Sequence, residues 1–143
     1  MKTIILSLMI IAGLASSTFA QKKIVVPAVV KSALVQKYPQ SSSAKVTWET
    51  EKGNYEANWG GKSGEDNSVQ FTPKGEFIEM VVAIPVSQLP KPVSDYVKGH
   101  YKSAKITEAG KVTDAQNKIT YEAEVNGHDI IFDENGKYIK GEK

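Results

Sequence analysis

The sequence contains no cysteine and no arginine, and each absence excludes a class of protein. Without cysteine the chain cannot form disulfides, thiolate metal sites or a lipid-modified N-terminus, so its stability must come from burial and backbone pairing. Without arginine it lacks the side chain that reads phosphates and base edges with two hydrogen bonds. Because 18 basic and 16 acidic residues leave a net charge of only +2, we expect no nucleic-acid partner.

Long apolar runs are scarce as well. The run from Ile4 to Leu14 is about half of the roughly 20 residues that a membrane span needs. It follows Lys2 and precedes the small residues of 16–20, which is the pattern of a signal peptide. We therefore expect cleavage after Ala20 and a periplasmic or secreted mature chain that begins at Gln21 and spans no membrane. Losing Lys2 leaves 17 lysines against 16 acids, so the mature chain is nearly neutral.

The sequence does contain one series of landmarks twice. Seven landmarks recur in the same order, about 60 residues apart. Self-similarity at a fixed period indicates a duplicated structural unit. The first copy has Val26-Pro27, Tyr38, Ala44-Lys45-Val46, Tyr55-Glu56-Ala57, Phe71, Gly75 and Phe77-Ile78; the second has Leu89-Pro90, Tyr101, Ala104-Lys105-Ile106, Tyr121-Glu122-Ala123, Phe132, Gly136 and Tyr138-Ile139.

Each copy has the pattern of one helix followed by four strands. Apolar residues at helical spacing predict helices over 26–38 and 90–101, with proline at each start. Period-two alternation predicts strands over 45–49, 54–59, 68–72 and 76–84, and again from 106 onward and over 119–125, 130–132 and 137–140. Asn126-Gly127 is the strongest hairpin signal. The segment 76–84 is apolar on both sides, so we place it centrally.

These elements predict an α+β fold, in which two helix-plus-four-strand repeats form one eight-stranded antiparallel sheet. Both helices lie on its apolar face, and the other face is left to solvent. The repeats span 21–85 and 86–143 and form one compact domain, because the linker at 86–88 is short; we expect a monomer. Trp48, Phe71, Ile106 and Phe132 are expected to share one core beneath both helices. The same buried phase of the strands also holds Trp59, Tyr55 and Tyr121. For these side chains core packing is favoured over a ligand pocket between sheet and helices.

The duplicated set of landmarks resembles the PepSY-like family of exported bacterial proteins. The resemblance lies in Tyr38-Pro39 at a helix end, Tyr-Glu-Ala in a strand and Phe132 to Lys137 at a turn. That family is grouped with β-lactamase-inhibitor-like folds. The resemblance covers essentially the whole mature chain and implies a tandem helix-plus-four-strand fold and an exported home. It implies no activity, and the inhibitor analogy holds for the fold alone.

Two features of the chain depart from the inhibitors. The resemblance implies docking through the open sheet face with aromatic anchors, and the inhibitors carry disulfides, which this chain cannot form. The open face here is a solvated, polar surface without the Trp, Tyr and Arg that dominate interfaces. It comprises Lys45, Thr47, Glu49, Asn54, Glu56, Asn58, Gln70, Thr72, Thr120, Glu122 and Glu124.

No constellation of residues predicts catalysis or a metal site. Asp133 to Gly136 looks like a fragment of a calcium loop, but its glycine falls at the wrong position and the equivalent turn, Thr72 to Gly75, has no acid. The two histidines, His100 and His128, lack thiol partners and a placed nucleophile. We therefore expect no enzyme, no cofactor and no metal.

The loop at 60–67 is the best candidate for a binding site. It contains Gly-Lys-Ser, but it joins two strands and lacks the spaced glycine of a phosphate loop. It is five residues longer than its counterpart in the second repeat, since 16 residues separate Tyr55 from Phe71 and 11 separate Tyr121 from Phe132. Insertions on a rigid scaffold often carry function, but a tolerated, mobile, Gly-rich tip is favoured over a functional loop. The binding candidates are Lys62, Glu65 and Asp66.

Three functions remain in order of preference. The first is an exported, non-catalytic module that binds a protein partner in the periplasm. The second is an inhibitor of a periplasmic hydrolase that acts through the 60–67 loop. The third is an enzyme, which ranks last because no nucleophile, base or metal set is present.

Overall fold

The computed structural model describes residues 24–141. The predicted signal peptide and its cleavage site lie outside these residues. The elements run in the order helix then four strands, twice: α1 (Ala28–Lys37), a 3₁₀ turn η1 (Pro39–Ser43), β1 (Thr47–Glu51), β2 (Asn54–Trp59), β3 (Asn67–Phe71), β4 (Phe77–Ala83), a second 3₁₀ turn η2 (Val86–Gln88), α2 (Lys91–His100), β5 (Ile106–Asp114), β6 (Ile119–Val125), β7 (His128–Asp133) and β8 (Tyr138–Gly141).

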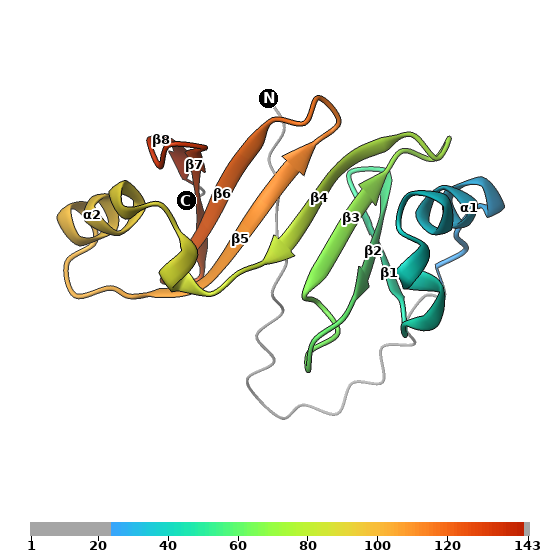
Figure 1. Ribbon diagram of the computed structural model, residues 1–143, viewed down its shortest axis with the longest axis horizontal. Coiled ribbons are helices and arrows are strands. Elements are labelled where there is room, and N and C mark those ends of the chain that lie inside the picture. Colours follow the sequence, from blue (N-terminus) through green and yellow to red (C-terminus); the bar gives the residue numbers. More distant parts are fainter. Residues whose placement is uncertain (1–23, 142–143) are drawn as a thin grey trace.

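The eight strands form one antiparallel sheet in which each strand pairs with the next along the chain, from β1 to β8 (Figure 1). This confirms the predicted α+β fold and the central place of the strand after residue 76, because β4 pairs with β5 at the middle of the sheet. The Asn126-Gly127 hairpin joins β6 to β7, as predicted. The 86–88 linker is the η2 turn, which leads directly into the second helix.

The two helices begin and end alike. Pro27 and Pro90 occupy the N-cap positions, where the missing proline N–H costs nothing. At the other end the backbone N–H of Tyr38 donates to Leu34 O and that of Tyr101 donates to Val97 O, each at 2.8–2.9 Å. Helical spacing from Val26 predicts Val29 on the buried face of α1, but Val29 is 51% exposed.

Strand register places both helices against the same face of the sheet. Met80 of β4 packs in the core beneath α1, and it pairs with Thr113 of β5. Thr113 and Ala109 lie four residues apart in one strand and so share a face, and Ala109 packs in the core beneath α2. The helices lie at opposite ends of the sheet (Figure 1).

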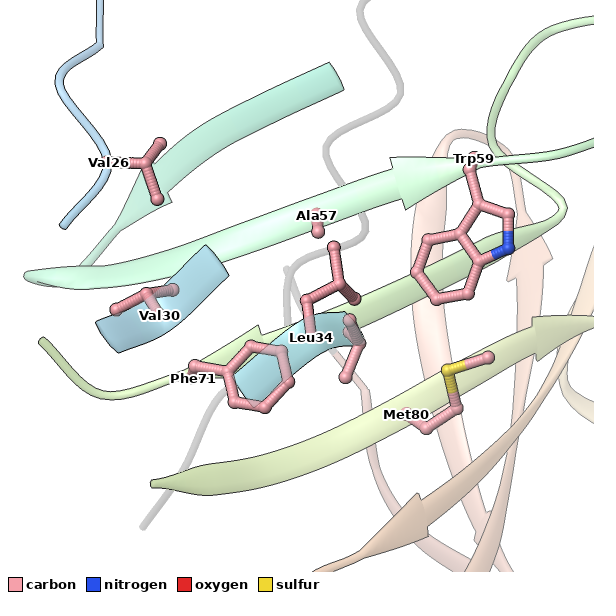
Figure 2. Close-up of a cluster of buried hydrophobic side chains, with 8 residues drawn as sticks. Val26, Val30, Leu34, Ala57, Trp59, Phe71 and Met80 are labelled. Carbon is pink, nitrogen blue, oxygen red and sulfur yellow. The ribbon is translucent and has the colours of Figure 1, made fainter. Parts of the chain in front are cut away.

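The prediction of one core under both helices is wrong, because the apolar residues beneath the helices form two separate clusters. Trp48 and Phe71 belong to the cluster beneath α1, where side chains from α1, β2, β3 and β4 converge (Figure 2). Ile106 and Phe132 belong to the cluster beneath α2. A ten-residue helix is only about 15 Å long, whereas eight strands span roughly 34 Å, so neither helix reaches the middle. There the helix-side positions hold Lys111 and Thr113.

The remaining aromatic residues confirm the core interpretation. Trp59 is 4% exposed, Tyr55 packs against the first cluster, and Tyr121 packs against the second. Among the helices that the structure describes, none is both long and apolar enough to cross a bilayer.

Candidate functional site

A cavity of about 370 Å³ lies on the open face, which is the sheet face opposite the helices. It does not lie between the sheet and the helices, where a ligand pocket was the less favoured alternative to core packing. Strands of both halves and the 60–66 loop contribute to it. The lining residues are Glu49, Glu56, Asn58, Ser63, Glu65, Asp66, Val81, Ala83, Ile84, Pro85, Val86, Thr107, Glu108, Ala109, Gly110, Glu122, Glu124 and Asp129.

The cavity corrects the expectation of a plain solvated face. Several polar residues of this face are buried: Asn58 is 6% exposed, Ser68 5%, and Glu122 2%. A strongly twisted antiparallel sheet turns its uncovered face into a trough, and side chains within it shield one another from water. The expected absence of aromatic anchors agrees with the cavity, because its lining contains no Trp, Tyr or Phe among the described residues.

Strand register aligns carboxylates directly across from one another. On the first half Glu49 of β1 pairs with Glu56 of β2. On the second half Glu108 of β5 pairs with Glu124 of β6, and Glu124 pairs with Asp129 of β7. Directly opposed residues have Cβ atoms about 4.5–5.5 Å apart, so these like charges repel one another. Gathering these acids on one face therefore carries an electrostatic cost.

Hydroxyl groups hold two of these carboxylates in place. Ser68 Oγ donates to Glu56 Oε1 at 2.8 Å across β2 and β3. Thr107 Oγ1 donates to Glu124 Oε1 at 2.6 Å across β5 and β6. Each bond uses one carboxylate oxygen and leaves the charge of the group intact.

Repulsion and burial raise the pKa of one glutamate on each side of the cavity. Partial burial raises the pKa of the Glu49 carboxyl above its ordinary value, and the charges of Glu56, Glu65 and Glu51 raise it further. Partial burial likewise raises the pKa of Glu108, followed by the charges of Glu124 and Glu65. Glu65 thus acts on both, which places the loop's carboxylate within electrostatic range of both halves.

A β-bulge and a glycine shape the second side of the cavity. The register shifts between Ile106 and Glu108, so that Ile106 stays on the helix side while Glu108 turns to the open face. Gly110, in mid-strand, pairs with Ala83 and Glu122. A Cβ on Gly110 would lie 3.0 Å from Val81 Cγ1 and 3.6 Å from Glu122 Oε2, so a larger residue would fill the cavity floor.

The inserted loop is folded against the sheet at its base. Ala83 N donates to Asp66 O at 2.9 Å, which ties the loop to the end of β4. Asn67 Nδ2 donates to Trp59 O at 3.1 Å and closes the loop between β2 and β3. Ser63, Glu65 and Asp66 consequently form part of the cavity wall.

The structure brings two of the three predicted binding residues to one place. Glu65 and Asp66 line the cavity with the acids of the sheet, and Lys62 does not. Sequence reasoning assigned Glu49, Glu56, Glu122 and Glu124 to the open face but missed that they form a cavity with the loop.

Two further acids of the cavity were missed, Glu108 and Asp129. Glu108 was hidden by the bulge, because simple alternation from Ile106 would place it on the helix side. Asp129 could have been found by continuing the alternation of β7 back from Ile131, with which it shares the open face.

The other candidates have local structural roles. The Asp133 carboxylate accepts hydrogen bonds from the backbone N–H groups of Asn135 and Lys137, both at 2.9 Å, and so closes its own turn. His100 stacks on Tyr96 with ring centroids 4.0 Å apart. Across residues 24–141, no three or more His, Asp or Glu side chains are arranged to hold a metal ion.

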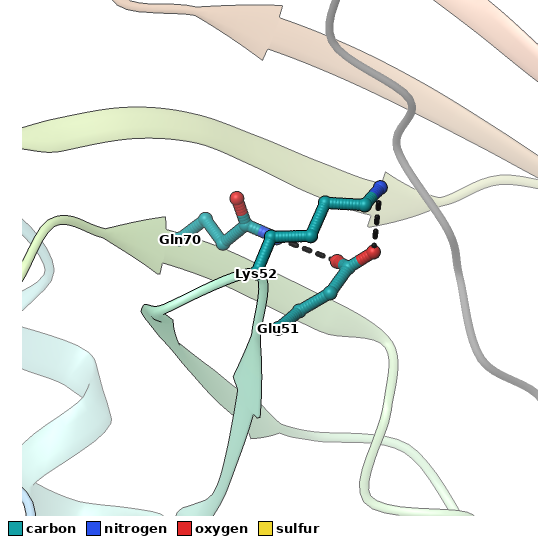
Figure 3. Close-up of polar contacts among 3 residues, drawn as sticks. All are labelled: Glu51, Lys52 and Gln70. Carbon is teal, nitrogen blue, oxygen red and sulfur yellow. Dashed lines mark hydrogen bonds and ion pairs between the residues drawn. The ribbon is translucent and has the colours of Figure 1, made fainter.

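At the outer end of the open face, charge is neutralised rather than gathered. Glu51 accepts a hydrogen bond from Gln70 Nε2 at 2.9 Å and pairs with Lys52 Nζ at 3.2 Å (Figure 3). This group lies outside the cavity lining. Here a lysine offsets the charge of an acid on the sheet.

Solved structures of Bacteroides proteins share this fold. A protein of Bacteroides eggerthii, described as a "putative periplasmic" protein, aligns with a TM-score of 0.69 and 20% identity, covering 83% of this chain and 89% of that one. A DUF2874 family protein of Bacteroides uniformis gives a TM-score of 0.68 and 20% identity, covering 82% and 89%. A BLIP-like protein of Bacteroides fragilis gives 0.63 and 16% identity, covering 85% and 88%. No curated protein matches this sequence.

A family model described as "Putative beta-lactamase-inhibitor-like, PepSY-like" matches residues 54–140. The match begins in β2 and ends in β8, so it includes most of the sheet, the second helix and the inserted loop. Since it covers more than half of the sequence, and the resemblance seen in the duplicated motifs points the same way, the chain belongs to the PepSY-like family.

Proposed function

We propose that this protein is an exported, non-catalytic module that binds a protein partner through its open face. The observation that carries the proposal is the cavity, which spans both halves of the sheet and the one loop that differs between them. Rigid strands supply the floor and the loop supplies part of the rim, which is a common arrangement for recognition sites. Export is supported by the leader pattern of residues 1–20 and by the periplasmic relatives in Bacteroides.

The test is capture of a partner with a blocked cavity as control. The mature protein would be immobilised and exposed to a periplasmic extract, and retained proteins identified by mass spectrometry. Ala83→Arg places a long side chain in the cavity at an exposed lining position. Ala115→Arg makes the same change at an exposed turn outside the lining.

A partner retained by the wild type and by Ala115→Arg, but not by Ala83→Arg, supports the proposal. Equal retention by both variants would move the binding site away from the open face. Retention of no protein by any form would remove the proposed function itself.

Inhibition of a hydrolase is the second candidate function, and the loop favours it. Ser63, Glu65 and Asp66 stand at the rim of the cavity, where they could enter an enzyme's active-site cleft. The family description and the BLIP-like relative point to the same class. Hydrolysis of a chromogenic β-lactam by purified periplasmic β-lactamases should fall on addition of the mature protein. Undiminished hydrolysis across such a panel would exclude this candidate.

A further inference from the structure

We propose that the partner segment held on the open face is a cationic, partly apolar stretch of polypeptide that carries lysine or arginine. The proposal rests on the proposed function, because it names the chemistry of the partner at the same cavity. It is carried by three separate features of that cavity: its segregated charge, its apolar strip and the dispersal of its carboxylates.

Half of the acidic residues of this chain gather around one cavity. Eight of the chain's 16 acidic residues line the cavity, although the net charge of the whole chain is +2. No lysine or histidine of the described chain is among the lining residues. The eight acids are Glu49, Glu56, Glu65, Asp66, Glu108, Glu122, Glu124 and Asp129. A negative trough on a nearly neutral protein repels phosphate and attracts cationic groups, since walls of low dielectric focus the field.

An apolar strip runs along the same cavity and argues for more than a bare cation. It consists of Val81, Ala83, Ile84, Pro85 and Val86, from the end of β4 to the start of η2. Val86 is 36% exposed, so apolar surface is available for contact. Acids beside an apolar strip match a polypeptide that carries both basic and aliphatic side chains, because lysine itself has an apolar stem beneath its charge.

The placement of the acids argues against a metal ion as the occupant. A calcium site needs six to eight oxygen ligands converging at 2.3–2.6 Å. The acids here are spread over β1, β2, β5, β6, β7 and the loop, and no three of them are arranged around one point among the described residues. Dispersed charges suit an extended partner with several basic groups spaced along its chain.

The experiment measures binding of labelled peptides to the mature protein by fluorescence anisotropy. The probes are fluorescein-labelled peptides of ten residues that alternate lysine with valine, glutamate with valine, or lysine with serine. The lysine–valine peptide should bind, and the glutamate–valine peptide should not. The lysine–serine peptide should bind at least about fivefold more weakly, because it cannot use the apolar strip.

Two matched charge variants locate the binding. Glu108→Gln with Glu124→Gln removes two charges from the cavity and should weaken the lysine–valine peptide at least about tenfold. Glu76→Gln with Glu134→Gln removes two charges from exposed turns and should change its affinity less than about twofold. Both double variants alter the net charge equally, so equal weakening would show diffuse attraction and overturn the proposal.

Four other outcomes would also overturn it. Binding of the glutamate–valine peptide as tight as that of the lysine–valine peptide would deny the charge argument. Spermidine that binds as tightly as the peptide would assign the site to a small polyamine. Calcium that binds the wild type by calorimetry, and is lost in the Glu108 and Glu124 double variant, would assign it to a metal. The last outcome is a captured partner that is lost with Ala83→Arg and yet is retained equally by the wild type and by the Glu108→Gln, Glu124→Gln double variant. That result would refute the cationic chemistry while leaving the proposed function standing.

Discussion

Gly75 and Gly136 hold equivalent places in the two halves, and their surroundings show why the duplicated motif keeps a glycine there. Each ends the turn before the last strand of its half with a φ of +81°. An added Cβ on Gly75 would lie 3.0 Å from Val29 O, and on Gly136 it would lie 3.0 Å from Pro90 Cβ. The turn therefore presses against the first turn of the helix in both halves, and only a residue without a side chain fits.

The glycines provide a matched series for measuring this contact. Gly53 has nearly the same φ, +82°, but an added Cβ meets nothing within 4 Å. Gly53→Ala should therefore cost only backbone strain, about 1–2 kcal/mol. Gly136→Ala should cost at least about 1 kcal/mol more, because it adds overpacking. Gly99→Ala, in an open position on α2, should be neutral or stabilise by up to about 1 kcal/mol. Equal losses of unfolding free energy for Gly53→Ala and Gly136→Ala in urea titrations would show that the turn does not pack tightly against the helix.

Phe132 tests the assignment of sheet faces at the level of one side chain. It is 0% exposed beneath α2, so Phe132→Ala should lower the free energy of unfolding by about 3–5 kcal/mol. Lys45 is exposed on the other phase, and Lys45→Ala should cost less than about 0.5 kcal/mol. Urea titrations give both values, and similar losses would mean that the faces are exchanged.

At the scale of elements, the sequence predicted the strands well and the bulges not at all. Alternation finds β2, β6 and β7 because one face of each is buried by a helix. A bulge adds one residue without changing composition, so nothing in the sequence marked the extra residue near Glu108 or the register shifts between Gln70 and Phe71 and between Ile131 and Phe132. The place of Glu108 in the cavity wall was missed for the same reason, since it depends on the bulge.

The inserted loop can be removed with little expected effect on stability. Replacing residues 60–66 with Asn-Gly shortens the connection from seven residues to two, which lowers the cost of loop closure by about 1 kcal/mol. The bond from Ala83 N to Asp66 O is lost, but Ala83 is exposed and water can replace it. The free energy of unfolding should therefore change by less than about 1 kcal/mol in a urea titration.

The same replacement should weaken binding of the lysine–valine peptide, because it removes Glu65 and Asp66 from the rim. A loop that serves only as a passive insertion would leave peptide affinity unchanged. A loss of stability well above 1 kcal/mol would show that the rim supports the sheet rather than the site.

At the scale of the whole molecule, the duplicated sequence predicted the order of elements but not how the halves divide the core. Counting apolar residues on one face cannot tell one core from two, because the division depends on helix length relative to sheet width. Likewise, the list of acids on the open face was available from alternation, yet their gathering into a cavity follows from sheet twist, the bulge and the loop together. Long-range geometry of this kind is set by packing rather than by local pattern.

The gathered acids predict that the folded protein becomes more stable as the pH falls below neutral. The pKa values of Glu49 and Glu108 are raised in the fold above the ordinary value of 4.5, by partial burial and by the charges of Glu56, Glu65 and Glu51 around the first and of Glu124 and Glu65 around the second. Between 4.5 and the raised values the folded state binds more protons than the unfolded state, so stability rises as the pH falls through this window and the gain is complete below 4.5. Replacing Glu49 and Glu108 by neutral residues should remove the same repulsion at neutral pH.

Glu49→Gln with Glu108→Gln should therefore melt at a higher temperature than the wild type at pH 7, and the difference should shrink as the pH approaches 4.5. Melting curves followed by circular dichroism would measure it, with Glu76→Gln and Glu134→Gln as the charge-matched control that parallels the wild type. If the melting temperature of the control rose as much as that of the cavity variant, the effect would come from net charge and not from the opposed carboxylates. The cavity variant should at the same time bind the lysine–valine peptide more weakly at pH 7, because the repulsion that destabilises the empty face is what a cationic segment relieves when it binds.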